Sequence, residues 1–234
     1  MVLYIENQIQ TMSIFYNLYN IIATALFPLS STEQEVSSFT PEQAYETLPR
    51  APTFDGNVLQ LPDTYSIFAY KDERVAKLIW NIKYKKSKKS TQIGGYALYK
   101  ELSTNPVRTT NSKKPIIVPV PITKRRKRER GYNQCELLID ELERLDTDNE
   151  FTVCKDLLER IQHTSRQTLK GRADRLESAK GVFNINTAVS VKIPNTSKII
   201  VIDDVITTGS TMKEALDTLR SVGFENVSGL SLAH

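Results

Sequence analysis

Two adjacent carboxylates precede a short, hydroxyl-rich loop near the C-terminal end of this 234-residue chain. Asp203 and Asp204 directly follow an apolar run. After two more residues a loop begins, which consists of Thr207, Thr208, Gly209, Ser210 and Thr211. The loop hydroxyls can donate hydrogen bonds to a phosphate. Two carboxylates would repel a phosphate, but they suit the vicinal hydroxyls of a sugar. The pattern predicts a ribose 5-phosphate site, with the two Asp residues on the ribose and the loop on the 5-phosphate.

The segments on either side of these residues are suited to hold them in place. Ile199–Ile202 is a β-branched run typical of a buried strand, and Met212–Ser221 has the apolar spacing of a helix. A loop that enters a helix presents free backbone N–H groups and the positive end of the helix dipole to an anion. The structural alternative is an ordinary strand, turn and helix with acidic capping. A plain cap requires neither adjacent acids nor four hydroxyls.

Strands and helices alternate along the rest of the chain. The predicted strands are Tyr65–Tyr70, Ile116–Pro121, one within Phe151–Leu158, Ile199–Ile202 and Val227–Leu232. The predicted helices run from Asp72 through Tyr84, over Gln92–Leu102, Gly131–Leu145 and Met212–Ser221. This alternation predicts an α/β fold with a mainly parallel central sheet and helices on both faces.

The N-terminal part of the chain has a different pattern. Residues 1–30 have the spacing of an apolar amphipathic helix, and residues 30–63 are rich in Ser, Thr, Glu and Pro with little periodicity. We therefore predict a helical and irregular appendage over residues 1–63, with a loosely structured connector after residue 30. The α/β domain is predicted over residues 64–234.

Ligands of an open α/β sheet bind at the carboxyl ends of its strands. This rule brings together the loops of 203–211 and 121–130 with the start of the helix after Tyr70. Pyrophosphate needs cations and backbone donors, and the loop of 121–130 supplies both. The residues predicted to bind pyrophosphate are Pro121, Lys124, Arg125 and Arg130.

Positive charge is concentrated in the middle of the chain. The net charge is +4, yet residues 81–130 hold 15 Lys and Arg and only two acids. Such a segment favours binding to a polyanion, although charge runs are usually solvated surface. The candidate nucleic-acid contacts are Lys85, Lys86, Lys88, Arg126, Arg128 and Arg166. Only Tyr84 and Tyr132 interrupt the basic runs with aromatic rings, so base stacking is not evident from the sequence.

Two cysteines, Cys135 and Cys154, are the only ones in the chain. Lone cysteines without a close pair indicate a reducing compartment and no zinc site. No apolar run is long enough to span a membrane, and no signal-peptide pattern is present, so we expect a cytoplasmic protein. Cys135 and Trp80 are both expected in the core.

Several motifs together resemble known protein families. Residues 199–211 resemble the phosphoribosyl pyrophosphate (PRPP) motif of type I phosphoribosyltransferases. Val118-Pro119-Val120-Pro121 followed by Arg130-Gly131-Tyr132-Asn133-Gln134, then Gly181-Val182-Phe183 and the ending Leu230–His234, resembles the ComF family over residues 65–234. Members of that family commonly begin with a zinc ribbon of paired cysteines. This chain has no cysteine there, so the resemblance implies a degenerate, metal-free segment over residues 30–50.

The resemblance implies a type I phosphoribosyltransferase fold and a role in DNA uptake during natural competence. It also implies PRPP binding with Mg²⁺, the metal being held by ligand oxygens and reaching Asp203 and Asp204 through water. Purine-salvage relatives often carry an acid where this chain has Thr207, so a purine acceptor is not predicted. Three functions remain open: a phosphoribosyltransferase of nucleotide metabolism, an accessory protein that binds single-stranded DNA or a helicase-type partner, and a regulator that senses PRPP. The sequence does not predict the oligomeric state.

Overall fold

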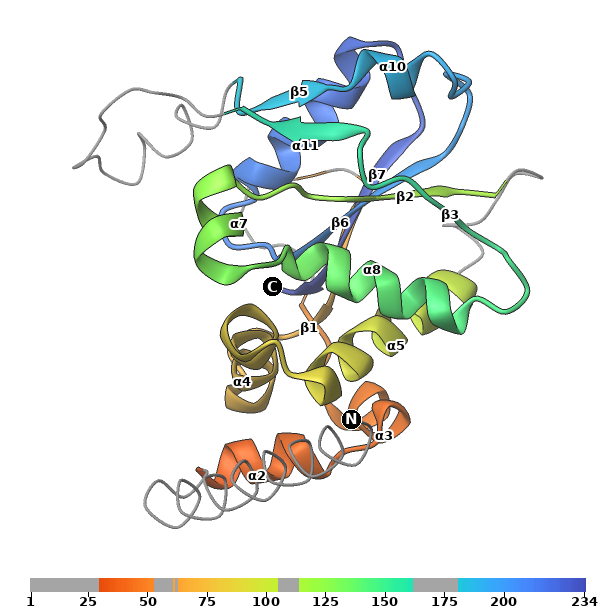
Figure 1. The fold of residues 1–234 in the computed structure, drawn as a ribbon. Coiled ribbons are helices and arrows are strands. Elements are labelled where there is room, and N and C mark those ends of the chain that lie inside the picture. Colours follow the sequence, from red (N-terminus) through yellow and green to blue (C-terminus); the bar gives the residue numbers. More distant parts are fainter. Residues whose placement is uncertain (1–29, 53–60, 62, 105–113, 162–180) are drawn as a thin grey trace, which may run out of the picture.

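A parallel five-stranded sheet forms the centre of the molecule (Figure 1). The computed structural model describes residues 30–52, 61, 63–104, 114–161 and 181–234. The strand order is β1 (Thr64–Phe68), β7 (Val227–Ala233), β6 (Ile199–Val205), β2 (Ile116–Pro119) and β3 (Thr152–Val153). Every neighbouring pair in this sheet is parallel. β6 is therefore an interior strand, and its carboxyl end lies between those of β2 and β7.

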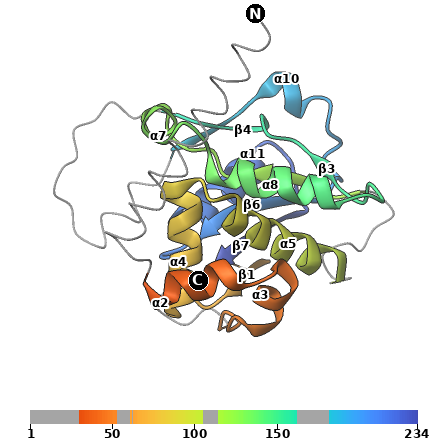
Figure 2. The ribbon, with the colours of Figure 1, turned by 60° about the horizontal axis from the view of Figure 1, so that its bottom comes forward.

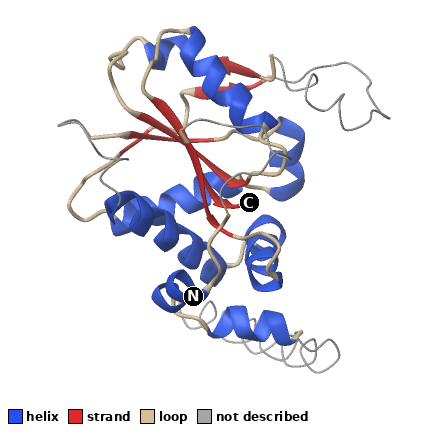
Figure 3. Cartoon of the chain, turned by 180° about the vertical axis from the view of Figure 1, so that it is seen from behind, coloured by secondary structure: helices blue, strands red, loops and turns tan. Residues whose placement is uncertain are grey.

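Helices cover both faces of the sheet, as the alternating pattern predicts (Figures 1 and 3). One face carries α11 (Ser210–Ser221) and α10 (Thr187–Ser190), and the other carries α4 (Glu73–Trp80), α5 (Lys88–Thr104) and α8 (Gln134–Leu145). Each face has its own apolar cluster. Ile200 and Ile202 belong to the α4–α5–α8 cluster, whereas Ile199 and Val201 belong to the α11 cluster. This division follows from the alternation of side chains along β6.

Two runs of basic residues, Lys83–Lys89 and Lys124–Arg130, contribute to helices. α4 continues directly into a π-helical turn, η1 (Asn81–Lys85), and its end is marked by Lys86 at φ +49°. The run predicted as a loop after Pro121 contains a seven-residue helix, α7 (Lys124–Arg130). Thr123 caps this helix by accepting a hydrogen bond from the Arg126 N–H. The loop prediction is wrong for these seven residues because a local cap was overlooked.

The appendage contains two capped helices, α2 (Ser31–Ser38) and α3 (Pro41–Thr47), beside α4 and α5 (Figure 2). Thr40 and Gln43 form a capping box, and Pro41 occupies the first turn of α3. Val36, Ala44 and Leu48 are buried in the same cluster as α4 and α5. The predicted loose connector is therefore wrong for residues 31–47, which form helices rather than a ribbon-like remnant. The helix predicted over residues 1–30 lies almost entirely outside the described residues.

A small antiparallel hairpin stands beside the main sheet. It consists of β4 (Leu158–Arg160) and β5 (Phe183–Ile185). The strand predicted within 151–158 is divided between β3, which joins the main sheet, and β4, which begins at Leu158. Residues 162–180, which include the candidate contact Arg166, lie outside the described part of the chain. Among the described helices, none combines the length and apolarity that a membrane span requires.

Candidate ribose-phosphate site

The two carboxylates lie within strand β6 rather than in the loop after it. β6 extends through Val205, and Asp203 is paired in register with Ser231 of β7. Consecutive side chains leave a strand on opposite sides, so the two acids meet different elements: Asp203 contacts Cys135 at the start of α8, and Asp204 contacts Lys83 of η1. Both carboxylates are buried at the carboxyl end of the sheet.

Asp203 has an environment that favours its protonated form. Its carboxylate accepts hydrogen bonds from the Asp204 N–H at 2.8 Å and from the Cys135 thiol, whose sulfur lies 3.7 Å away. Burial, together with the neighbouring Asp204 charge, raises the pKa of Asp203 to about 7. Burial also raises the pKa of the Cys135 thiol well above its usual value. Cys135 is fully buried, so the prediction of a core position is confirmed.

Lys83 is a residue of this site that the sequence analysis missed. Its ammonium group lies 3.2 Å from Oδ2 of Asp204, and that oxygen has no hydrogen-bond partner among the described residues. The side chain of Asp204 is 5% exposed and that of Lys83 22%. The position of Lys83 in the sequence could have indicated this role. Lys83 directly follows Ile82, the last apolar residue on the buried face of the α4–η1 helix, whereas the other lysines of the run lie further along.

The raised pKa of Asp203 predicts that this carboxylate destabilises the ligand-free protein at alkaline pH. Between the ordinary Asp pKa of about 4 and about 7, the folded state holds a proton that the unfolded state has lost, so stability falls as pH rises through this window. We expect Asp203→Asn to raise the melting temperature at pH 8 and to raise it much less at pH 4. Thermal unfolding of both proteins across this range measures the difference, and a constant difference would contradict the prediction.

The predicted phosphate loop joins β6 to α11 in a conformation that leaves donors available. Gly209 occupies the N-cap position of α11 at φ +81°, a left-handed conformation that suits glycine. The N-cap residue has no side chain to cap this helix, and the Ser210 N–H donates only a long hydrogen bond of 3.5 Å to the Thr208 hydroxyl. The hydroxyls of Thr208 and Ser210 lie 3.0 Å apart, and Thr207 is exposed. The geometry fits an anion at the N-terminus of α11.

A cavity of about 530 Å³ lies between the end of β2 and the β4–β5 hairpin. Pro121 and Lys124, two of the four predicted pyrophosphate residues, line it together with Arg160. The other two residues are engaged elsewhere. Arg125 pairs with Glu129 at 2.7 Å, and Arg130 donates a hydrogen bond to Gln134 at 3.0 Å.

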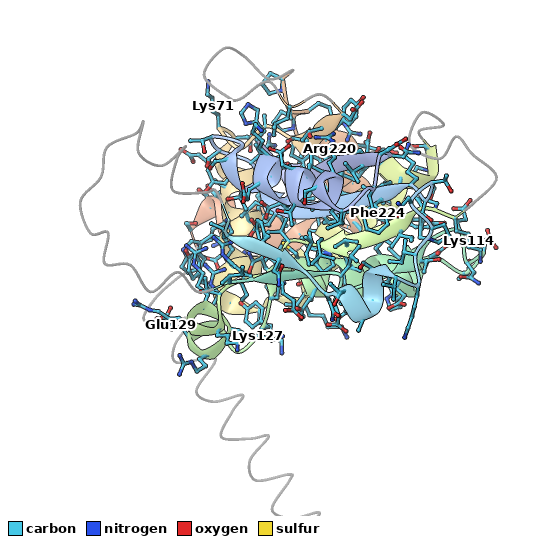
Figure 4. The ribbon with its side chains drawn as sticks, turned by 90° about the horizontal axis from the view of Figure 1, so that it is seen from above. Lys71, Lys114, Lys127, Glu129, Arg220 and Phe224 are labelled. Carbon is cyan, nitrogen blue, oxygen red and sulfur yellow. The ribbon has the colours of Figure 1, made fainter. Side chains whose placement is uncertain are left out.

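The remaining predicted contacts are dispersed. Lys85 pairs with the buried Glu33 of α2, Lys86 lies over the Tyr132 ring, and Lys88 is exposed at the start of α5. Arg126 and Arg128 are exposed on α7, where the side chains of Lys127 and Glu129 project from the molecule (Figure 4). No group of three or more His, Cys, Asp or Glu suited to a metal is found in the part of the chain that the structure describes.

The start of α4 does not join the acid pair, although the strand-end rule predicted it there. Asp72 caps α4 and forms a hydrogen-bonded ion pair with Arg74, which also pairs with Glu35 of α2. It is η1, at the far end of this helix, that carries Lys83 to Asp204. The reason is the direction of α4, which leads from the carboxyl end of β1 across to β6.

Comparison with known proteins agrees with this geometry. Residues 159–232, which include β6, the loop and α11, match the family model described as the phosphoribosyl transferase domain. Over these residues the chain is similar to phosphoribosyltransferase domains. Its α/β architecture, with a parallel sheet flanked by helices, is that of the type I phosphoribosyltransferase fold, as predicted.

One curated relative matches the chain over a longer stretch than the domain model does. The chain is 38% identical to Competence protein F of Haemophilus influenzae over 118 residues, which are 50% of this chain and 49% of that protein. The chain thus aligns with about half the length of this curated relative. The resemblance to a ComF-like phosphoribosyltransferase, which the motifs indicated, is confirmed at this level.

Proposed function

We propose that this protein binds PRPP, with the ribose at the end of β6 and the 5-phosphate at the start of α11. The observation that carries the proposal is the buried acid pair followed by a helix N-terminus without a side-chain cap. Asp203 and Asp204 supply charged acceptors for sugar hydroxyls, and Oδ2 of Asp204 is paired with the ammonium group of Lys83 at 3.2 Å. The loop of Thr207, Thr208, Gly209, Ser210 and Thr211 supplies backbone N–H groups and hydroxyls for the phosphate.

The same geometry suggests which residues would contact the pyrophosphate when the ribose phosphate is transferred to an acceptor. Pro121 and Lys124 line the cavity next to the site, where a cation stabilises the negative charge of the departing pyrophosphate. Arg125 and Arg130 are the further predicted contacts to this group, and they reach it only after leaving Glu129 and Gln134. The chain supplies carboxylate oxygens, which Mg²⁺ prefers, and the Mg²⁺ that accompanies PRPP neutralises pyrophosphate charge when it is bound. Asp203 and Asp204 are the residues that would hold this Mg²⁺, through water.

We place this activity in DNA uptake during natural competence. The support is the name of the H. influenzae relative, Competence protein F. The alternative is a phosphoribosyltransferase of nucleotide metabolism. Transfer of a ribose phosphate to a nitrogen acceptor, detected as release of pyrophosphate from PRPP, distinguishes an enzyme from a protein that only senses PRPP.

The proposal is tested by titration calorimetry of the full chain with PRPP and with ribose 5-phosphate, each in the presence of Mg²⁺. We expect both ligands to bind, with PRPP the tighter because only it carries pyrophosphate. Absence of binding by either ligand would refute the proposal. Binding of PRPP that is equally tight without Mg²⁺ would refute the role assigned to the metal.

A second candidate function, binding of single-stranded DNA, is favoured by a row of aromatic rings and cations that the sequence analysis did not anticipate. Trp80, expected in the core, is 43% exposed, and Tyr84 is 60% exposed. Their ring centroids lie 5.7 Å apart. The guanidinium of Arg130 lies 5.1 Å from the Tyr84 centroid, which connects this row to basic helix α7. Exposed rings next to phosphate-binding cations are suited to stack bases of a single strand.

The prediction for this surface separates stacking from charge. We expect Trp80→Ala and Tyr84→Ala each to weaken binding of an oligo(dT) strand by about tenfold, with an unchanged dependence on salt. Charge reversal at Arg126 and Arg128 should reduce the salt dependence, because fewer counterions are released. Fluorescence anisotropy at several salt concentrations measures both effects.

Tyr65→Ala, at an exposed ring on β1 that lies outside this row, is the matched control. Unaltered affinity in both ring variants would exclude stacking on this row.

A further inference from the structure

Arg160, at the end of β4, is a cation without an acidic partner among the residues that the structure describes. Its guanidinium lies 5.3 Å from the centroid of the Phe183 ring on β5, and the residue is only partly exposed. Within the described residues, no carboxylate lies within ion-pair distance of Arg160. Arginine in a partly buried position is normally paired or bound to an anion. Within the described residues, the hairpin therefore positions a cation that has no bound anion or acidic partner.

The location of Arg160 connects it to the proposed site. It lines the cavity of about 530 Å³, and Lys124 at the start of α7 lines the same cavity. Arg160 is also close enough to Arg126 and Asp203 for their charges to act on it. Burial and Arg126 lower the pKa of Arg160, and Asp203 opposes them. Arg160 and Lys124 thus line one cavity, and the charge of Arg126 acts on Arg160. None of the three is in an ion pair within the described parts of the chain.

The carboxylates of the cavity do not account for these cations. Glu136 lies 3.6 Å from Lys127, so that acid already has a basic neighbour. Glu159 and Asp156 also line the cavity, but neither lies within ion-pair distance of Arg160 or Lys124 in the described structure. Lys155, a further lining residue, pairs with Asp140 of α8. The unmatched positive charge is therefore confined to the part of the wall formed by Arg160 and Lys124.

We propose that Arg160 and Lys124 form an oxyanion site in the cavity between the β4–β5 hairpin and α7, which binds a phosphate or carboxylate group of a ligand beside the ribose. The Phe183 ring lies 5.3 Å from the guanidinium carbon and limits the positions that this side chain can take at the cavity wall. A planar guanidinium can donate to two oxygens of one anion. This inference rests on the proposed function for the location of the ribose. It extends that function by assigning a binding residue on the hairpin.

The oxyanion has two possible sources with the same chemistry. One is the pyrophosphate of PRPP, in which case Arg160 assists the departure of the leaving group. The other is an acid group on the acceptor. Among the described residues that line the cavity, none is Phe, Tyr or Trp. They provide no aromatic face for an uncharged base, so an acidic acceptor would be anchored by charge instead.

The test compares Arg160→Leu and Arg160→Lys with the wild-type chain. We expect inorganic pyrophosphate to bind the ligand-free protein and Arg160→Leu to weaken it by about tenfold or more, since hydrogen bonds to charged groups are among the strong ones. Arg160→Lys should restore part of the affinity. Arg144→Leu is the matched control, because Arg144 is exposed on α8 and pairs with Glu141 away from the cavity. Melting curves confirm that each variant is folded, and Arg160→Gln replaces the Leu variant if that one unfolds.

Two further titrations identify the source of the anion. If Arg160 binds the pyrophosphate of PRPP, Arg160→Leu loses affinity for PRPP but not for ribose 5-phosphate. If it binds an acid of the acceptor, PRPP affinity is unchanged, and sulfate titrated onto PRPP-saturated protein binds in an Arg160-dependent manner. Equal behaviour of Arg160→Leu and wild type toward pyrophosphate, PRPP and sulfate would overturn the inference. Failure of ribose 5-phosphate to bind the wild type would instead refute the ribose assignment, while the pyrophosphate result still tests Arg160.

Discussion

Replacing both site carboxylates with amides, Asp203→Asn with Asp204→Asn, is expected to lower the affinity for PRPP by at least about a hundredfold. Each carboxylate is a charged acceptor for sugar hydroxyls, and a hydrogen bond to a charged group contributes about 1.5–3 kcal/mol. An amide has nearly the same shape but presents one neutral acceptor, so the fold is retained while this energy is lost. Titration calorimetry with PRPP and Mg²⁺ measures the change.

The control for this experiment is a pair of substitutions that removes the same charge elsewhere. Asp148 is exposed after α8, and Asp217 of α11 is half exposed and pairs with Lys213; neither lines the cavity. Asp148→Asn with Asp217→Asn should leave PRPP affinity within about twofold, because exposed charges contribute little. Asp203→Asn alone should raise thermal stability at pH 8, so weaker binding by that single variant would exclude misfolding as its cause, and melting curves check that the double variant is folded. Unchanged PRPP affinity in the site variant would refute the ribose assignment.

Lys83→Met should produce the second largest effect, because it removes the cation that offsets the two buried acids. Lys83 lowers the pKa of Asp203, so its removal should move that pKa above about 7. Asp203 would then be mostly protonated at pH 7, and we expect PRPP affinity to fall by about tenfold there and to recover partly at pH 9. Stability should fall at pH 8 by about 1–3 kcal/mol, the range for a buried polar group that loses its partner.

The sign of the pH dependence distinguishes this role from a packing role. In Lys83→Met, stability relative to wild type should be lost above pH 7 and regained at pH 4, where Asp203 carries a proton in both proteins. Urea unfolding at the two pH values measures this difference. Lys88→Met, in the same lysine run but exposed on α5, serves as the control. A stability loss of equal size at both pH values would show that Lys83 acts through its methylene packing instead.

The elements that the sequence predicted correctly are those whose signal is local. The order of apolar run, acid pair, glycine loop and helix in residues 199–221 lies within one strand–loop–helix unit, so neighbouring residues in sequence are also neighbours in space. The parallel sheet followed from the same kind of signal, because alternating strands and helices allow few other arrangements. A buried position for Cys135 was likewise predictable from its place at the start of an apolar helix face.

Other predictions failed where a local signal was weak or was outweighed by distant contacts. Residues 31–47 have little apolar periodicity, yet capping hydrogen bonds and burial against α4 and α5 make them helical. Trp80 lies at the end of α4 on the side away from the sheet, and its ring is flanked by Lys77 at 4.6 Å and by Tyr84. A polar appendage and a charged helix surface depend on partners that periodicity alone does not identify.

The sequence by itself determined that a sugar-phosphate site follows an interior strand, because the residue types that recognise ribose and phosphate occur there in one continuous segment. Only the tertiary structure decided which distant residues complete that site. Lys83 reaches Asp204 because α4 and η1 cross the sheet from β1 to β6, and Arg160 meets Lys124 because the β4–β5 hairpin stands over the end of β2. Charge interactions depend on distance in space, and that distance is determined by the packing of elements that are far apart in the chain.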